Sequence, residues 1–215
     1  MKGQINSTLF YSKAHLRATN LCPKPVSFKT MNLESKNSGM IELASPRMPK
    51  SYGYVGPPAI LARTMSAPKG APIRCTADLR SWIKATLKKP DSQIISTYVI
   101  DTNGVLLIAD RRSEHVACAG GKPVLSAGEM TFLACGDELE VIQVSNQSTG
   151  YCPEPESWPQ VALALDRIPI PHPDRFAQET LFRRCNSCGQ INIVKDNWLV
   201  CSFCEKELPK QWNLA

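Results

Sequence analysis

Between residues 76 and 168, the apolar positions follow first the helical period, then the strand period, and then the helical period again. After Thr76, which can cap a helix, apolar side chains recur on one face until Pro90 stops the pattern: Leu79, Trp82, Ile83 and Leu87. A second helix is predicted over 157–168, where Pro159 lies in the permissive first turn and one face is apolar. These two helices flank the central part of the chain.

Four strand-like runs lie between the predicted helices, over residues 94–101, 105–110, 124–133 and 139–145. Asn103-Gly104 separates the first two runs, and this dipeptide is a strong hairpin signal between such segments. The last two runs turn at Cys135-Gly136-Asp137. The pattern therefore predicts an α+β fold, with an antiparallel sheet of about four strands and flanking helices.

The first 72 residues follow neither period. They are rich in Ser, Thr, Pro, Lys and Asn, a composition that predicts a disordered segment. Residues 1–70 hold ten Lys or Arg and two acidic residues, a net charge of +8, so the rest of the chain carries −2 of the total +6. We therefore expect a disordered basic segment (1–72), an α+β domain (73–172) and a small C-terminal module (173–215).

Three interpretations of the basic segment stay open. Its composition resembles an organellar transit peptide, and residues 73–77 resemble the cleavage region of plastid-targeted precursors. The alternatives are a plain disordered tail and a basic arm that binds nucleic acid or an acidic partner. The chain has no secretory signal and no apolar run near the length of a membrane span, about 20 residues. We expect an intracellular protein, cytoplasmic or plastid if the segment is a transit peptide, and neither secreted nor bound to membranes.

The C-terminal module contains two Cys-x-x-Cys pairs separated by twelve residues. The pairs are Cys185 with Cys188 and Cys201 with Cys204, and each pair can place two thiolates on one tight turn. Residues 190–194 and 198–200 are expected to pair as strands across the turn 195–197, which would bring both thiolate turns together. Four converging sulfurs suit a tetrahedral Zn²⁺ ion, whose role would be structural because protein fills every coordination position.

The two cysteine pairs resemble those of a four-cysteine zinc ribbon with rubredoxin-like knuckles, over about a tenth of the chain. The resemblance implies a Zn²⁺-dependent module, whereas the α+β domain is assigned to no family. Iron, a pair of disulfides and free thiols are the alternatives. Disulfides are disfavoured because the five other cysteines make an odd total of nine and show no framework spacing.

Candidate catalytic residues gather in the loops of the α+β domain. The stretch 146–153 resembles an Asn-x-Ser-Gly-His-Tyr-x-Pro segment of small bacterial toxin-like and effector domains, although Thr149 is inserted and no His precedes Tyr151. The resemblance implies one site formed by Glu129, Asn146, Ser148 and Tyr151, with His115 or Cys152 as the titrating group. The alternative is a turn whose Asn and Ser side chains bond to nearby backbone groups.

Three functions follow from these features. We expect a zinc-binding protein that acts as a protein-binding or adaptor module, with aromatic residues of the ribbon exposed as interface anchors: Trp198, Phe203 and Trp212. The alternatives are a small enzyme that uses the loop site and a nucleic-acid-binding zinc ribbon. Protein is favoured over nucleic acid as the partner, because the predicted folded part is close to neutral. The sequence specifies neither a substrate nor an oligomeric state.

Overall fold

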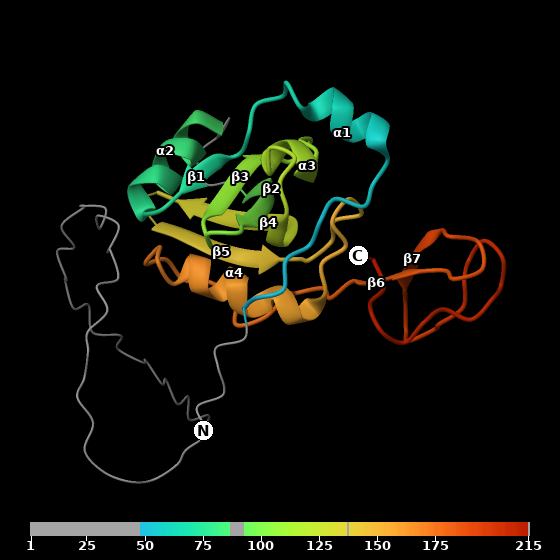
Figure 1. The fold of residues 1–215 in the computed structure, drawn as a ribbon. Helices are drawn as coiled ribbons and strands as arrows, with labels where there is room; N and C mark the ends of the chain where they lie inside the picture. The colour runs from blue at the N-terminus through green and yellow to red at the C-terminus, as the bar shows by residue number, and fades with distance from the viewer. Residues whose placement is uncertain (1–47, 87–92, 137, 215) are drawn as a thin grey trace, which may run out of the picture.

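The computed structural model describes residues 48–86, 93–136 and 138–214 (Figure 1). A five-stranded antiparallel sheet forms the centre, in the order β1-β3-β2-β4-β5. Its strands are β1 (Ala71–Ile73), β2 (Gln93–Asp101), β3 (Leu106–Asp110), β4 (Val124–Cys135) and β5 (Glu138–Val144). The two predicted hairpins, β2–β3 and β4–β5, are confirmed, and β2 pairs with β4 to join them into one sheet.

The turn between β2 and β3 shows why its sequence forms a hairpin. The Asp101 carboxylate accepts hydrogen bonds from the backbone N–H groups of Asn103 and Val105, at 2.9 and 2.8 Å. Gly104 has a positive φ of 74°, a conformation that glycine adopts without steric cost. The predicted Asn-Gly turn is therefore held by the side chain that precedes it.

Helices and loops cover both faces of the sheet. On one face lie α2 (Thr76–Thr86) and α4 (Trp158–Leu165), which follows the 3₁₀ turn η1 (Pro155–Ser157). The opposite face carries α3 (His115–Cys118), and α1 (Pro58–Thr64) lies next to α3. Both long predicted helices are confirmed, and Leu79 and Ile83 are the buried residues of α2. The fold is the expected α+β arrangement, with side chains packed on both faces of the sheet.

Residues 48–72 correct the prediction of disorder in this region. The Tyr52 side chain is 1% exposed, and its backbone pairs with Val124 at the start of β4. Residues 71–73 form the edge strand β1 beside β3. The sequence pattern does not predict this strand, because three residues are too few to show a period. Cleavage within residues 73–77 would remove β1 and Tyr52 from the fold, so the cleavage-region interpretation is not supported. Residues 1–47, on which the other predictions for this segment fall, lie outside the described residues.

The C-terminal module is built on a strand pair that differs from the predicted one. β6 (Leu181–Arg184) pairs with β7 (Ile191–Val194), whereas the prediction paired 190–194 with 198–200. The turn at 195–197 is present, since the Trp198 N–H donates to the Lys195 carbonyl at 2.8 Å. Val200 instead forms a single bridge with Glu207. β7 therefore pairs with the strand before it in the chain, across the first Cys-x-x-Cys turn, rather than with the segment after it.

Trp212 attaches the C-terminal module to the α+β domain. Its indole Nε1–H donates to the Cys152 carbonyl at 2.9 Å, and its ring meets the Tyr52 ring edge-on at a centroid distance of 5.5 Å. The Lys50 Nζ lies 3.6 Å from the Trp212 ring centroid and 2.6 Å from a Glu154 carboxylate oxygen. The expectation that Trp212 is an exposed anchor is therefore wrong, because its ring is half-buried and contacts Lys50 and Tyr52.

Within the part of the chain that the structure describes, no helix combines the length and the apolar character needed to cross a membrane.

Replacing Tyr52 with Ala should destabilise the protein by about 3–5 kcal/mol, because a fully buried aromatic ring would leave a cavity. Urea unfolding measures the change in free energy of unfolding. The matched control is Met48→Ala, since the Met48 side chain is 86% exposed and its loss should change stability little. Equal stability of the two variants would contradict the placement of residues 48–55 in the core.

Candidate functional site

Two similar turns present the four cysteines of the C-terminal module. In the first turn, the Gly189 N–H donates to the Cys185 carbonyl at 2.9 Å, and Gly189 has a positive φ of 75°. In the second turn, the Glu205 N–H donates to the Cys201 carbonyl at 2.9 Å, and Glu205 has a positive φ of 60°. Each Cys-x-x-Cys pair thus forms a knuckle, a tight turn that directs two sulfurs to the same side.

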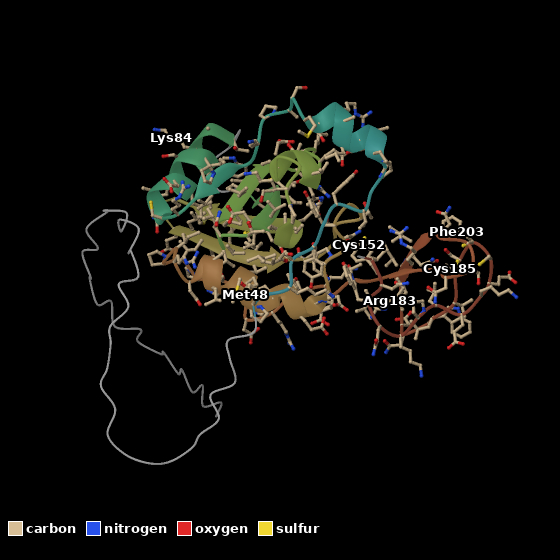
Figure 2. The ribbon with its side chains drawn as sticks, in the orientation of Figure 1. Met48, Lys84, Cys152, Arg183, Cys185 and Phe203 are labelled. Atoms are coloured by element: carbon tan, nitrogen blue, oxygen red, sulfur yellow. The ribbon has the colours of Figure 1, made fainter. Side chains whose placement is uncertain are left out.

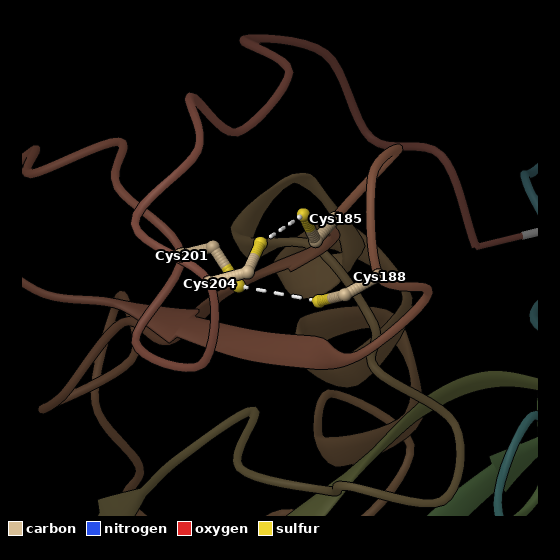
Figure 3. Close-up of side chains that lie close together, drawn as sticks. All are labelled: Cys185, Cys188, Cys201 and Cys204. Carbon is tan, nitrogen blue, oxygen red and sulfur yellow. Dashed lines mark hydrogen bonds between the residues drawn. The ribbon is translucent and has the colours of Figure 1, made fainter.

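The four sulfurs converge between the knuckles (Figure 3). The Cys185 and Cys204 Sγ atoms are 3.5 Å apart, the Cys188 and Cys201 Sγ atoms are 3.6 Å apart, and all four lie within 4.8 Å of one another. A tetrahedral ion with metal–sulfur bonds of about 2.3 Å needs sulfurs about 3.8 Å apart. The spacing across the knuckles is therefore that of a four-thiolate metal centre.

Hydrogen-bond donors favour ionisation of two of the four thiols, Cys185 and Cys201. Burial and the neighbouring cysteine sulfurs raise the pKa of the other two, that of Cys204 to about 12. The N–H of Cys188 leads the effects that lower the pKa of Cys185, with the N–H of Ser187 acting in the same direction. Desolvation opposes ionisation of Cys201, but the N–H groups of Phe203 and Cys204 and the Asn192 amide lower its pKa to about 6. Metal ligands must be thiolates, so these donors favour the form that binds a cation.

All four cysteines have free thiols, so the disulfide alternative is not what the structure contains. The small core around them is made of four buried side chains, two of which are the ligand candidates Cys185 and Cys201; the others are Val194 and Leu208. Four cysteines are thus positioned to bind a metal ion at the centre of the module. A tetrahedron of protein ligands leaves no coordination position for water or substrate.

The candidate catalytic residues occupy a different region, at the end of β5. Gly128 permits this arrangement, because a Cβ atom there would lie 2.0 Å from the Ser145 carbonyl oxygen. The Asn146 amide is buried and fully used: Nδ2 donates to the carbonyls of Pro153 and Thr180, and Oδ1 accepts from the Thr180 N–H at 2.7 Å. Asn146 therefore ties the loop to the segment that leads into β6.

Tyr151, Cys152 and Ser148 are also buried within this loop. The Tyr151 hydroxyl donates to the Lys122 carbonyl at 2.8 Å, and burial raises its pKa well above the usual range. Burial likewise raises the pKa of Cys152 to about 12, and its thiol donates to the Thr149 carbonyl. The Ser148 hydroxyl is buried without a hydrogen-bond partner in the described part of the chain. With these raised pKa values, neither the Tyr151 hydroxyl nor the Cys152 thiol is ionised to act as a nucleophile at neutral pH.

His115 and Glu129 lie closer to solvent. The Glu129 carboxylate is 3.4 Å from Arg111 Nε, and its side chain is 43% exposed. The His115 Nε2–H donates to the Gly128 carbonyl at 3.0 Å. A cavity of about 50 Å³ next to His115 is also lined by Thr149 and Gly150, but not by the side chains of the other five candidates. The structure brings His115 near the loop without forming one pocket from the predicted set.

Asn192 is a residue of the metal region that the sequence interpretation missed. Its side chain lies between β7 and the second knuckle, where Nδ2 is 3.5 Å from the Cys201 sulfur. A polar residue in a short strand is usually read as solvent-facing, and Asn192 alternates with two isoleucines. Only the tertiary arrangement shows that Asn192 is on the inner side, with 4% of its surface exposed.

Comparisons of the chain with models of protein families, with curated proteins and with solved structures found no significant match. The assignment of function therefore depends on the geometry of the site itself.

The half-buried position of His115 predicts an acid-sensitive contribution to stability. Desolvation lowers the pKa of His115 in the folded protein below the usual 6.5, so the unfolded chain binds the proton more readily. This contribution is fully present above pH 6.5 and is lost as the pH falls through 6.5 toward the lower folded value. His115→Gln, which can keep the donor to Gly128, should reduce the fall in unfolding free energy with acidification by up to about 1.4 kcal/mol per pH unit. Urea unfolding of both proteins over that range measures the difference, and identical slopes would contradict it.

Proposed function

We propose that this protein binds one Zn²⁺ through Cys185, Cys188, Cys201 and Cys204 and that the ion is structural. The observation that carries the proposal is the convergence of four free thiols within 4.8 Å. Sulfur-only tetrahedral sites select Zn²⁺ or iron. Zn²⁺ is the better candidate for a structural role because it has no redox chemistry and no geometric preference that the knuckles must satisfy.

The construction of the module supports a structural role for the ion. Apart from two ligand cysteines, its core has only Val194 and Leu208 as fully buried side chains. So small an apolar core cannot offset the conformational entropy of ordering the module, and metal binding supplies the missing free energy in domains of this kind. When bound, the ion would cross-link the two knuckles.

We further propose that the module presents a protein-binding surface. Trp198 is 71% exposed and Phe203 is 65% exposed, both on the loops around the cysteines, and Ile193 of β7 is 42% exposed. Ile193 and Trp198 lie on either side of the tight turn at Lys195. Large exposed apolar side chains in a small module are the anchors that protein interfaces use.

The charges of the module favour a protein over a nucleic acid as partner. Residues 173–215 contain six Lys or Arg and five Asp or Glu, so they form no strongly basic patch. The Arg183 side chain is buried and donates to the carbonyls of Phe182 and Lys210, which removes it from any phosphate-binding surface. The enzyme alternative has less support, because Asn146 and Tyr151 are engaged with backbone carbonyls.

Purified protein should contain one zinc ion per chain and lack the visible absorption of an iron–thiolate centre. Cys201→Ser should abolish stoichiometric zinc and unfold the C-terminal module, because a buried ligand would be lost. The matched control is Cys135→Ser, which removes an exposed free thiol outside the cluster and should keep full zinc content. Elemental analysis and tryptophan fluorescence measure these effects. Equal zinc content in the two variants would overturn the proposed site.

The binding surface can be tested with a photo-crosslinking amino acid placed at position 198 in one variant and at position 163 in another. Leu163 is the matched control, because it is also an exposed apolar residue, at 53%, but lies on α4. We expect the amino acid at position 198 to crosslink one specific protein in cell extract. This partner, once purified, should bind the wild-type chain at least 10-fold more tightly than it binds the Trp198→Ala variant. The same products from both positions, or equal affinity for Trp198→Ala, would contradict the surface.

A further inference from the structure

Asn192 joins β7 to the second knuckle through both ends of its side-chain amide. Oδ1 accepts hydrogen bonds from the Ser202 N–H at 2.9 Å and from the Ser202 hydroxyl at 3.0 Å. Nδ2 donates to the Gln190 carbonyl at 3.0 Å and lies 3.5 Å from the Cys201 sulfur. Every polar atom of this buried group therefore has a partner.

The neighbours fix which end of the amide faces the sulfur. The Ser202 backbone N–H can only donate, so the amide oxygen must face it. The Gln190 carbonyl can only accept, so the amide NH₂ group must lie on its side. The NH₂ group is on the side of Cys201, and reversing the amide would place two donors together at Ser202 and two acceptors together at Gln190. The N–H to sulfur orientation thus follows from the backbone.

The charge of a four-thiolate site explains how the contact between Asn192 and the Cys201 sulfur could stabilise a bound metal ion. Four thiolates and one divalent cation leave two excess negative charges, and a buried charge is costly unless donors solvate it. Cys201 is 0% exposed, whereas Cys188 is exposed to water. Backbone N–H groups of Phe203 and Cys204 already approach Cys201. Among the described residues, Cys201 is the one thiol of the four that also receives a side-chain N–H, from Asn192.

Packing alone does not explain an asparagine at this position. The inward-facing neighbour on β7 is Val194, and a second aliphatic residue would bury apolar surface without the cost of desolvating an amide. A buried amide is favourable where both of its ends are paired, as they are here. The partners of Asn192 are the backbone of the knuckle on one end and a candidate metal ligand on the other.

We propose that Asn192 is a positioning residue for the metal centre, whose Nδ2–H donates to the Cys201 thiolate and increases the affinity of the four-cysteine site for Zn²⁺. This inference rests on the proposed metal site. The amide orients the Cys201 sulfur toward the ion and disperses the negative charge that the ion leaves uncompensated. Groups that hold metal ligands in this way typically contribute 10- to 100-fold in metal affinity.

The test uses full-length protein with the metal alone as probe. Zn²⁺ affinity is measured by competition with a chromophoric chelator, and Co²⁺ is then substituted to record its sulfur-to-cobalt charge-transfer absorption. Asn192→Ala and Asn192→Asp should bind Zn²⁺ about 10- to 100-fold more weakly. Their charge-transfer band should move to lower energy, because a thiolate without its donor gives up an electron more easily. The Asn192→Asp variant keeps an oxygen that can accept the hydrogen bonds from Ser202, so it provides the test if the alanine variant does not fold.

Ser202→Ala is the matched control, since it removes a hydrogen bond at the oxygen end of the amide and leaves the sulfur contact in place. Its charge-transfer band should coincide with that of wild type. Weaker Zn²⁺ binding in the Asn192 variants with an unshifted band would overturn the thiolate role, as would unchanged affinity. Absence of any cobalt–thiolate band in wild type would instead overturn the proposed metal site, so the two failures are distinguishable.

Discussion

The convergence of four thiols is the constraint on which the C-terminal module depends. Two knuckles can direct their sulfurs to one point only if the chain between them returns over a short distance, and β7 with the turn at Lys195 provides that return. Cys185 and Cys201 are at the same time half of the small core. Two of the candidate metal ligands are therefore also core side chains, so removing either of them removes part of the core as well.

Both apolar contacts and hydrogen bonds join the C-terminal module to the α+β domain. Figure 2 shows Cys152 where the α+β domain meets the C-terminal module. Phe182 and Leu214 pack against Cys152, and the Trp212 indole donates to the Cys152 carbonyl. Asn146 ties the same loop to Thr180, just before β6. The loop that resembled a catalytic segment in the sequence is thus surrounded by structural contacts. Its polar residues are explained by the need to pair backbone groups where two parts of the chain meet.

Features governed by local signals could be predicted from the sequence, and features governed by distant contacts could not. The Asn103-Gly104 turn and the cysteine spacing carry their geometry within a few residues, and both predictions are confirmed as local structure. Tyr52 lies in a segment of disordered composition, yet it pairs with Val124, more than seventy positions later. The pairing of β7 with β6 and the inward side of Asn192 are likewise set by tertiary contacts. Tyr52 and Val124 share no short window of the sequence, and β7 could pair with the segment on either side of it.

The contact between Tyr52 and Trp212 has a consequence for how the protein is made. On the ribosome, Tyr52 emerges long before Trp212, so the α+β domain can form its sheet while one side of Tyr52 is still uncovered. The exposed side of Tyr52 is covered only after the C-terminal module has been translated and Trp212 has packed against it. A newly made chain whose C-terminal module has not yet folded would therefore expose an aromatic surface of the kind that chaperones recognise.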